Sequence, residues 1–261
     1  MLTLSTVTAI VVYLIAAGMQ WRILAGHTSS GSPLIKVIGL IAVVAHTYAA
    51  YLDLHRPTGI HLDFFSAGSL IGWLVAALVL LSSLRQKIDN LFVGVFPLAA
   101  LALIFNLFSP DTHIAKAYDS GLVIHILISI LAYSIFTLAA FQAILLAKQD
   151  YQLKHHQTRG LIKSLPPLQT MEKLLFEMIW TGFILLTASL LTGAWVFEDL
   201  FAQHLIHKTV LSILAWLLYV TLLTGRHLLG WRSHRAIRWT VGGFIVLMLS
   251  FFGSKFVLEL L

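Results

Sequence analysis

Residues 120–147 read SGLVIHILISILAYSIFTLAAFQAILLA, the longest run of the chain without Asp, Glu, Lys or Arg. Roughly 17–25 apolar residues in a helix cross the hydrocarbon core of a bilayer, so this run predicts a membrane-spanning helix. Seven further uncharged runs lie at 1–21, 37–52, 64–84, 90–110, 178–197, 209–225 and 239–254. We therefore predict an all-α polytopic membrane protein, a single transmembrane domain over 1–261 with eight transmembrane helices.

The composition favours the same fold class. Apolar residues make up 59% of the chain and charged residues 11%, and the mean hydropathy is +0.89. An average soluble domain is about 45–50% apolar and about 25% charged, so the lipid bilayer is the first expected partner. The same apolar mass excludes nucleic acid as a partner despite the net charge of +6. Because cysteine is absent and histidine occurs 12 times, any metal or cofactor ligand is expected to be an imidazole.

The basic residues predict the orientation. Thirteen of the 17 lysines and arginines lie in or beside the connections after the first, third, fifth and seventh runs. The opposite side holds only Arg56, Lys116, Lys208 and Lys255. Cytoplasmic loops carry the excess of basic residues in membrane proteins. Both termini are therefore expected on the outer side.

Two histidines fall inside predicted spans, where a polar side chain marks a candidate functional site. His46 lies about 9 Å below the outer end of its run and His125 about 6 Å below the outer start of its own, at 1.5 Å per residue. Imidazoles at similar depth can ligate one haem iron from both sides. The alternative is that each ring hydrogen-bonds to a neighbouring helix or a water.

A third candidate region is the outer connection 197–208, FEDLFAQHLIHK. His204 and His207 are three residues apart and share one helix face, beside an apolar stripe that predicts an interfacial amphipathic helix. This segment is interpreted as an outer lid, or as a surface helix with two solvated histidines. Lys208 is the weaker third candidate, because its charge can attract a carboxylate. No nucleotide-binding loop, HExxH motif or nucleophile elbow is present, so no catalytic residue and no enzyme activity are expected.

Three stretches together resemble a known family: HILISILAYSIFTLAAFQAILLAKQ (125–149), LPPLQTMEKLLFEMIWTGFILLTASLLTGAW (165–195) and LSILAWLLYVTLLTGRHLLGWRSHRAIRWTVGGF (211–244). They are similar to the CcsA-type cytochrome c assembly proteins, which handle haem in membranes, and most of all to the short YpjD subgroup. The resemblance covers about 120–256 well and 34–110 more loosely. It implies a multi-pass protein of the bacterial inner membrane, with haem b held near the outer surface by His46 and His125. It also implies a membrane or periplasmic partner in cytochrome assembly.

The chain departs from the family pattern at three places. The tryptophan-rich outer haem-binding segment of the family is replaced by EDLFAQHLIHKT (198–209), in which only Lys208 corresponds. A second membrane histidine is expected near Thr224, and a second outer histidine after the last run; neither is found in the sequence. These departures place haem delivery to an apocytochrome in question.

Three functions are therefore open. The first is a haem-binding inner-membrane protein related to cytochrome c assembly. The second is a non-catalytic membrane scaffold or partner subunit that kept the fold and lost haem. A small-solute transporter ranks last, because the predicted spans contain few charges that could form a polar path.

Overall fold

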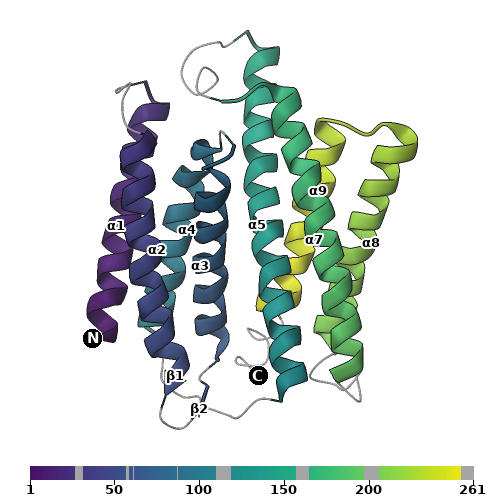
Figure 1. The fold of residues 1–261 in the computed structure, drawn as a ribbon. Helices are drawn as coiled ribbons and strands as arrows, with labels where there is room; N and C mark the ends of the chain where they lie inside the picture. Colours follow the sequence, from purple (N-terminus) through teal and green to yellow (C-terminus); the bar gives the residue numbers. More distant parts are fainter. Residues whose placement is uncertain are drawn as a thin grey trace. The chain divides into compact units, whose positions relative to one another are not determined.

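The computed structural model describes residues 1–26, 32–56, 59–60, 62–86, 88–109, 119–156, 165–196 and 206–253. Within these residues the chain forms eight α-helices and one short hairpin, which confirms the all-α class (Figure 1). The chain divides into two compact units, described separately below. The first comprises 1–118 with 156–166, and the second comprises 119–155 with 167–261.

The first unit is a bundle of four helices. Its helices are α1 (Leu2–Leu24), α2 (Ser32–Leu54), α3 (Phe64–Ser82) and α4 (Phe92–Leu107). Each packs against two others, α1 on α2 and α4, and α3 on α2 and α4, which closes the bundle around one core. A hairpin of β1 (His55–Arg56) and β2 (Gly59–Ile60) joins α2 to α3, and a 3₁₀ turn, η1 (Asp89–Leu91), precedes α4.

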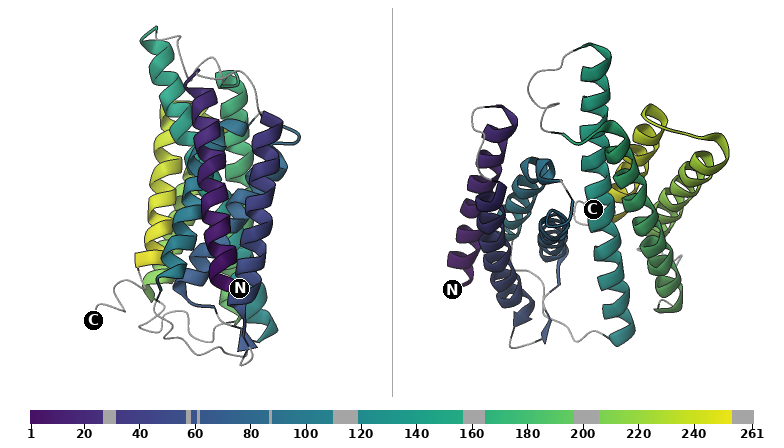
Figure 2. Two further views of the ribbon diagram at one scale, coloured as in Figure 1. Left: turned by 90° about the vertical axis from the view of Figure 1, so that its left-hand side faces the viewer. Right: turned by 45° about the horizontal axis from the view of Figure 1, so that its top comes forward.

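The second unit repeats this closed arrangement, with α5 and α7 longer than any helix of the first unit (Figure 2). It contains α5 (Ser120–Lys154), α7 (Leu168–Val196), α8 (Ile206–Leu229), α9 (His234–Met248) and a π-helical turn, η2 (Leu249–Gly253). Here α7 packs on α5 and α8, and α9 packs on α8 and α5. The carboxylate of Asp119 accepts a hydrogen bond from the Gly121 backbone and caps the start of α5.

One aromatic layer links all four helices of the second unit. The Phe136 ring of α5 stacks on the Tyr219 ring of α8 with a centroid distance of 4.1 Å. On α7, a Cβ at Gly182 would lie 2.9 Å from the Phe136 ring; on α9, a Cβ at Gly243 would lie 2.9 Å from the Tyr219 ring. Each ring therefore occupies the space that a glycine leaves open, as small residues do where membrane helices approach closely.

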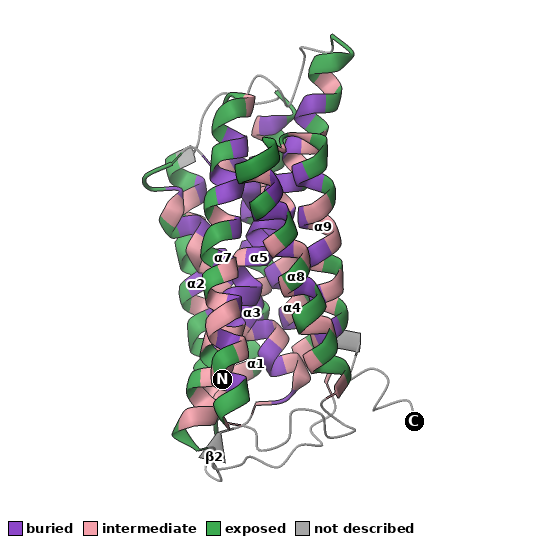
Figure 3. Ribbon diagram, turned by 90° about the vertical axis from the view of Figure 1, so that its right-hand side faces the viewer, coloured by how far each residue is buried: buried purple, intermediate pink, exposed green. Residues whose placement is uncertain are grey.

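The exposed helix faces are apolar, as a lipid environment requires. Large exposed side chains include Leu14, Leu40 and Leu191, and Figure 3 shows exposed and buried residues alternating around the helices. Seven of the described helices are long and apolar enough to cross a membrane. The exception is α9, whose 15 residues rise only about 22 Å, less than the roughly 30 Å of a bilayer core. The eighth predicted span, 239–254, thus falls on this shorter helix and the π-helical turn that continues it.

Candidate functional site

His125 lies on the second turn of α5, and its ring faces the last turns of α7. Its Nδ1 is 3.1 Å from the carbonyl oxygen of Ser189 and 3.2 Å from Oγ1 of Thr192. The Thr192 hydroxyl donates its own hydrogen to the carbonyl of Ala188 or Ser189. Both neighbours of Nδ1 therefore act as acceptors, so Nδ1 carries the hydrogen.

This hydrogen-bond pattern fixes the chemical character of the other ring nitrogen. In a neutral imidazole only one nitrogen carries a hydrogen, so a donating Nδ1 leaves the lone pair on Nε2. Histidine ligands of metals are usually held in this way, with the second ring N–H donated to a carbonyl. His125 is thus in the tautomer that ligates iron through Nε2.

The backbone and side chains around His125 hold the ring in place. Gly193 of α7 lies against it, and a Cβ there would come within 3.0 Å of Cε1 of His125. One turn further along α5, the Ser129 hydroxyl donates to the His125 carbonyl at 2.7 Å, so the Ser189 hydroxyl donates to Ser129, also at 2.7 Å. The position of the imidazole is therefore determined jointly by α5 and α7.

The first turn of α8 contributes two of the predicted lid residues. This helix begins at Ile206, so His207 and Lys208 are helical and do not belong to the outer connection. The Lys208 ammonium lies 5.2 Å from the centre of the Phe251 ring, and it is close enough to His125 for a coulombic interaction. The structure thus brings Lys208 and His125 to one end of the second unit. His204 and most of the proposed lid, 197–205, lie outside the described residues.

His46 lies in the first unit, in different surroundings. It is completely buried, its Nε2 is 3.0 Å from Oγ of Ser69 on α3, and its Nδ1 is 3.4 Å from the hydroxyl of Tyr13 on α1. The Tyr13 ring also meets the imidazole edge to face at 5.9 Å. Both ring nitrogens of His46 are therefore occupied by side chains of neighbouring helices.

The two histidines differ in how well they fit a haem iron. His125 fits in its tautomer, because the hydrogen bonds at Nδ1 place the ring lone pair on Nε2. His46 as folded does not, because either Ser69 or Tyr13 must give up its hydrogen bond before a ring nitrogen can reach iron. His46 and His125 belong to different units, so their joint ligation stays a prediction. Among the described residues no group of three or more His, Cys, Asp or Glu gathers in a way that could hold a metal ion.

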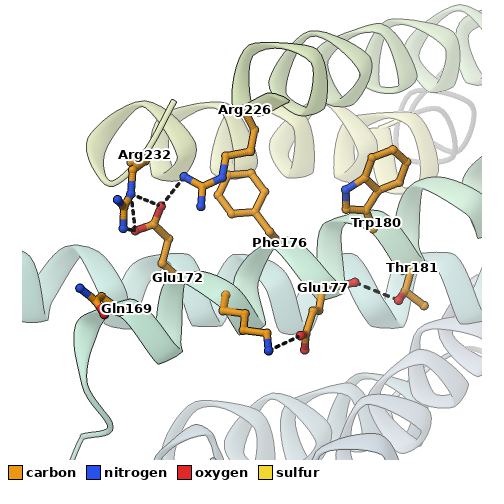
Figure 4. Close-up of a pocket in the computed structure, with 9 residues that line it drawn as sticks. Gln169, Glu172, Phe176, Glu177, Trp180, Thr181, Arg226 and Arg232 are labelled. Atoms are coloured by element: carbon orange, nitrogen blue, oxygen red, sulfur yellow. Dashed lines mark hydrogen bonds and ion pairs between the residues drawn. The ribbon is translucent and has the colours of Figure 1, made fainter. Parts of the chain in front are cut away.

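At the opposite end of the second unit lies a polar cluster that the sequence analysis missed. The buried carboxylate of Glu172 accepts hydrogen bonds from Arg226 Nη1 at 2.8 Å and from Arg232 Nε at 3.2 Å (Figure 4). Both arginines had been explained by orientation alone. The only sign of this cluster in the sequence is that Glu172 is an acidic residue within a predicted basic loop. Its spacing from Arg226 and Arg232, which follow 54 and 60 positions later, does not indicate that they form ion pairs.

Comparison with known proteins identifies the family. Inner membrane protein YpjD of Escherichia coli K12 is 32% identical over 228 residues, which is 86% of each chain. Protein HemX of Brevibacillus brevis is 26% identical over 188 residues, 69% of each chain. No solved structure matches the chain. The family described as cytochrome c assembly protein matches residues 31–261. With most of its length matched, the chain belongs to the cytochrome c assembly protein family.

Proposed function

We propose that this protein binds haem b in the bacterial inner membrane and that His125 ligates the iron through Nε2. The observation that carries the proposal is the pair of acceptors at Nδ1, the Ser189 carbonyl and the Thr192 hydroxyl. The family is linked to haem handling. The inner membrane location is supported by the name of the Escherichia coli relative and by the seven candidate spans.

Each residue at this end of the second unit has a definite role in the proposal. Ser189 and Thr192 orient the imidazole, and Gly193 leaves the space that the ring occupies. Lys208 supplies a positive charge suited to a carboxylate such as a haem propionate. The bound haem would supply an iron centre whose properties depend on its axial ligands. We propose no catalytic role, because the chain has no cysteine and any thioether bond would need thiols from a partner protein.

The proposed orientation places His125 near the outer face of the membrane. It follows from the thirteen basic residues on one side and four on the other. With both termini outside, the chain must cross the membrane eight times. In this topology α9 and η2 together form the last span. A helix shorter than the bilayer core is tolerated when the bilayer thins locally or flanking residues reach the interface.

The absorption spectrum of the purified protein tests the haem proposal. Protein from haem-replete cells is expected to show a Soret band, and His125→Ala is expected to lose it. His227→Ala is the matched control, because His227 is an exposed histidine near the other end of α8. A folded parent protein without a Soret band, or an unchanged band in His125→Ala, would contradict the proposal.

A membrane scaffold without haem is the second candidate function. One observation favours it: the completely buried His46 acts as a hydrogen-bonding core residue between α1, α2 and α3. Under this reading neither His46 nor His125 is needed for haem, and the parent protein remains colourless while folded. A Soret band that depends on His125 would exclude the scaffold reading.

A further inference from the structure

The second unit contains a pocket of about 450 Å³ where α7 begins and α8 ends. Its polar wall is formed by Glu172 and Lys173 of α7, Arg226 of α8 and Arg232, which lies between α8 and α9. Its apolar wall is formed by Phe176 and Trp180, one and two turns further along α7 (Figure 4). The pocket lies at the opposite end of the second unit from His125 and is independent of the haem proposal.

Glu172 holds the two arginines in place without using all their hydrogen-bond donors. Its side chain is only 4% exposed, whereas those of Arg226 and Arg232 are 34% and 57% exposed. Arg226 uses Nη1 for Glu172 and the Trp231 carbonyl, and Arg232 uses Nε and Nη2 for Glu172. Among the described residues, Nε and Nη2 of Arg226 and Nη1 of Arg232 have no hydrogen-bond partner. Because guanidinium groups recognise phosphate by paired N–H donors, these atoms suit a phosphate group.

The charge at the pocket favours an anion. Lys173 pairs with Glu177 at 3.8 Å, and Glu172 neutralises one of the two arginines, which leaves one positive charge in excess. Arg226 is held over the Phe176 ring, 4.5 Å from its centre, in a cation–π contact. The positive charge is therefore fixed in position before a ligand arrives.

The apolar wall makes the pocket amphipathic. Trp180 is eight residues beyond Glu172 on α7, about 12 Å further along the helix axis. Its side chain is 51% exposed, which places a large ring on the lipid-facing surface beside the pocket. A ligand that fills both walls thus has an anionic head at the arginines and a hydrocarbon chain along Phe176 and Trp180.

We propose that this pocket binds the phosphate headgroup of an anionic phospholipid, with an acyl chain lying along α7. Basic pockets between membrane helices bind anionic headgroups in this way. Free phosphate shares the headgroup chemistry but makes no contact with the apolar wall. The two sources therefore differ in what Trp180 contributes to binding.

Thermal unfolding of the full-length protein, delipidated in detergent, tests the proposal. Phosphatidylglycerol is expected to raise Tm, whereas phosphatidylethanolamine with the same acyl chains and inorganic phosphate are expected to have little effect. Arg232→Gln is expected to weaken phosphatidylglycerol binding about tenfold, the loss of roughly one charge-assisted hydrogen bond. Arg238→Gln is the matched control, because Arg238 is exposed on α9 and does not line the pocket.

A second variant separates binding from folding. Trp180→Leu keeps every charge of the pocket and is expected to weaken phosphatidylglycerol binding without changing Tm in the absence of lipid. Equal stabilisation by the two phospholipids, or equal losses in Arg232→Gln and Arg238→Gln, would overturn the site. If inorganic phosphate raised Tm as much as phosphatidylglycerol does, the proposal that the pocket binds a phospholipid would be wrong.

Discussion

His46 and His125 are both histidines inside membrane-spanning helices, and what separates them is the set of atoms that faces their ring nitrogens. At His125, two acceptors meet Nδ1, which fixes the tautomer that carries its lone pair on Nε2. At His46, hydroxyl groups of two other helices occupy both nitrogens. A hydroxyl can donate or accept, so Tyr13 and Ser69 satisfy a neutral imidazole in either tautomer.

We predict that His46 stabilises the first unit through its hydrogen bond to Ser69. Ser69→Ala is expected to lower the free energy of unfolding by roughly 0.6–2 kcal/mol, the range for polar contacts between membrane helices. His46→Ala is expected to cost more, about 2–5 kcal/mol, because it also leaves a cavity. Chemical unfolding of the two single variants and the double variant in detergent measures the coupling between the residues.

The control for this pair is Thr8→Val. Thr8 is exposed and its hydroxyl bonds only to the Leu4 carbonyl of its own helix, so little change in stability is expected. Additive losses in the double variant would contradict a direct His46–Ser69 contribution. A His46→Ala protein that unfolds normally but loses a haem spectrum would instead favour His46 as an iron ligand.

The position of each histidine along its helix could be predicted from the sequence, but the hydrogen-bond partners could not. Counting residues from the charged ends of a run is enough to place His46 in the second half of α2 and His125 in the second turn of α5; that these ends face outward stays a prediction. Which nitrogen meets which neighbour depends on the rotation and packing of α1, α3 and α7, and no residue spacing encodes that. For the same reason, the sequence did not predict the pairing of Glu172 with Arg226 and Arg232.

At the level of elements, helix contacts in the second unit depend on glycines placed opposite aromatic rings. Gly182 and Gly243 each face a ring of the Phe136–Tyr219 stack. The Tyr219 hydroxyl also donates to the Thr240 carbonyl of α9 at 3.3 Å. Since the ring and the backbone approach each other closely, this layer tolerates no added side-chain volume on the facing helices.

We predict that Gly243→Ala destabilises the second unit, because the added methyl group would lie 2.9 Å from Cζ of Tyr219. Overpacking of this kind costs typically about 1–3 kcal/mol. The adjacent Gly242→Ala meets no atom within 4 Å and is the matched control. Its expected effect is neutral or stabilising by up to about 1 kcal/mol, from the better helix propensity of alanine. Equal unfolding midpoints for the two variants would show that the layer is not tightly packed.

The positions of charged residues in the sequence predicted the ends of the helices only in part. Seven uncharged runs correspond to helices that are long enough to span a bilayer, although several helices extend beyond their runs. For example, α5 continues to Lys154 because charged residues are good helix formers once they leave the hydrocarbon core. The last run was expected to be one regular span, but the chain there changes to a π-helical turn at Leu249. There, hydrogen bonds from Tyr133 to the Leu247 carbonyl and from Ser250 to the Lys208 carbonyl engage the end of α9.

At the level of the whole molecule, both units are closed four-helix arrangements, each with polar groups at two ends. In the first unit, Lys36 pairs with Asp89 at 3.1 Å and donates to the Ser83 carbonyl at the end expected to be cytoplasmic. At its other end Asp53 accepts hydrogen bonds from Ser66 and Asn106. Polar contacts from α2 to neighbouring elements therefore lie at both ends of the first unit.

The proposed orientation can be tested directly because the chain has no cysteine, so a single introduced cysteine is the only thiol. We predict that a membrane-impermeant maleimide labels His55→Cys in intact spheroplasts and labels Gln86→Cys and His156→Cys only after lysis. All three positions are exposed at helix ends. Ser254→Cys, which lies beyond the described residues, tests whether an eighth span exists. We expect this thiol to be labelled in intact spheroplasts, because in the proposed topology α9 and η2 together cross the membrane. If Ser254→Cys reacts only after lysis, the protein has seven spans and its C-terminus lies inside, although His125 would keep its place near the outer face.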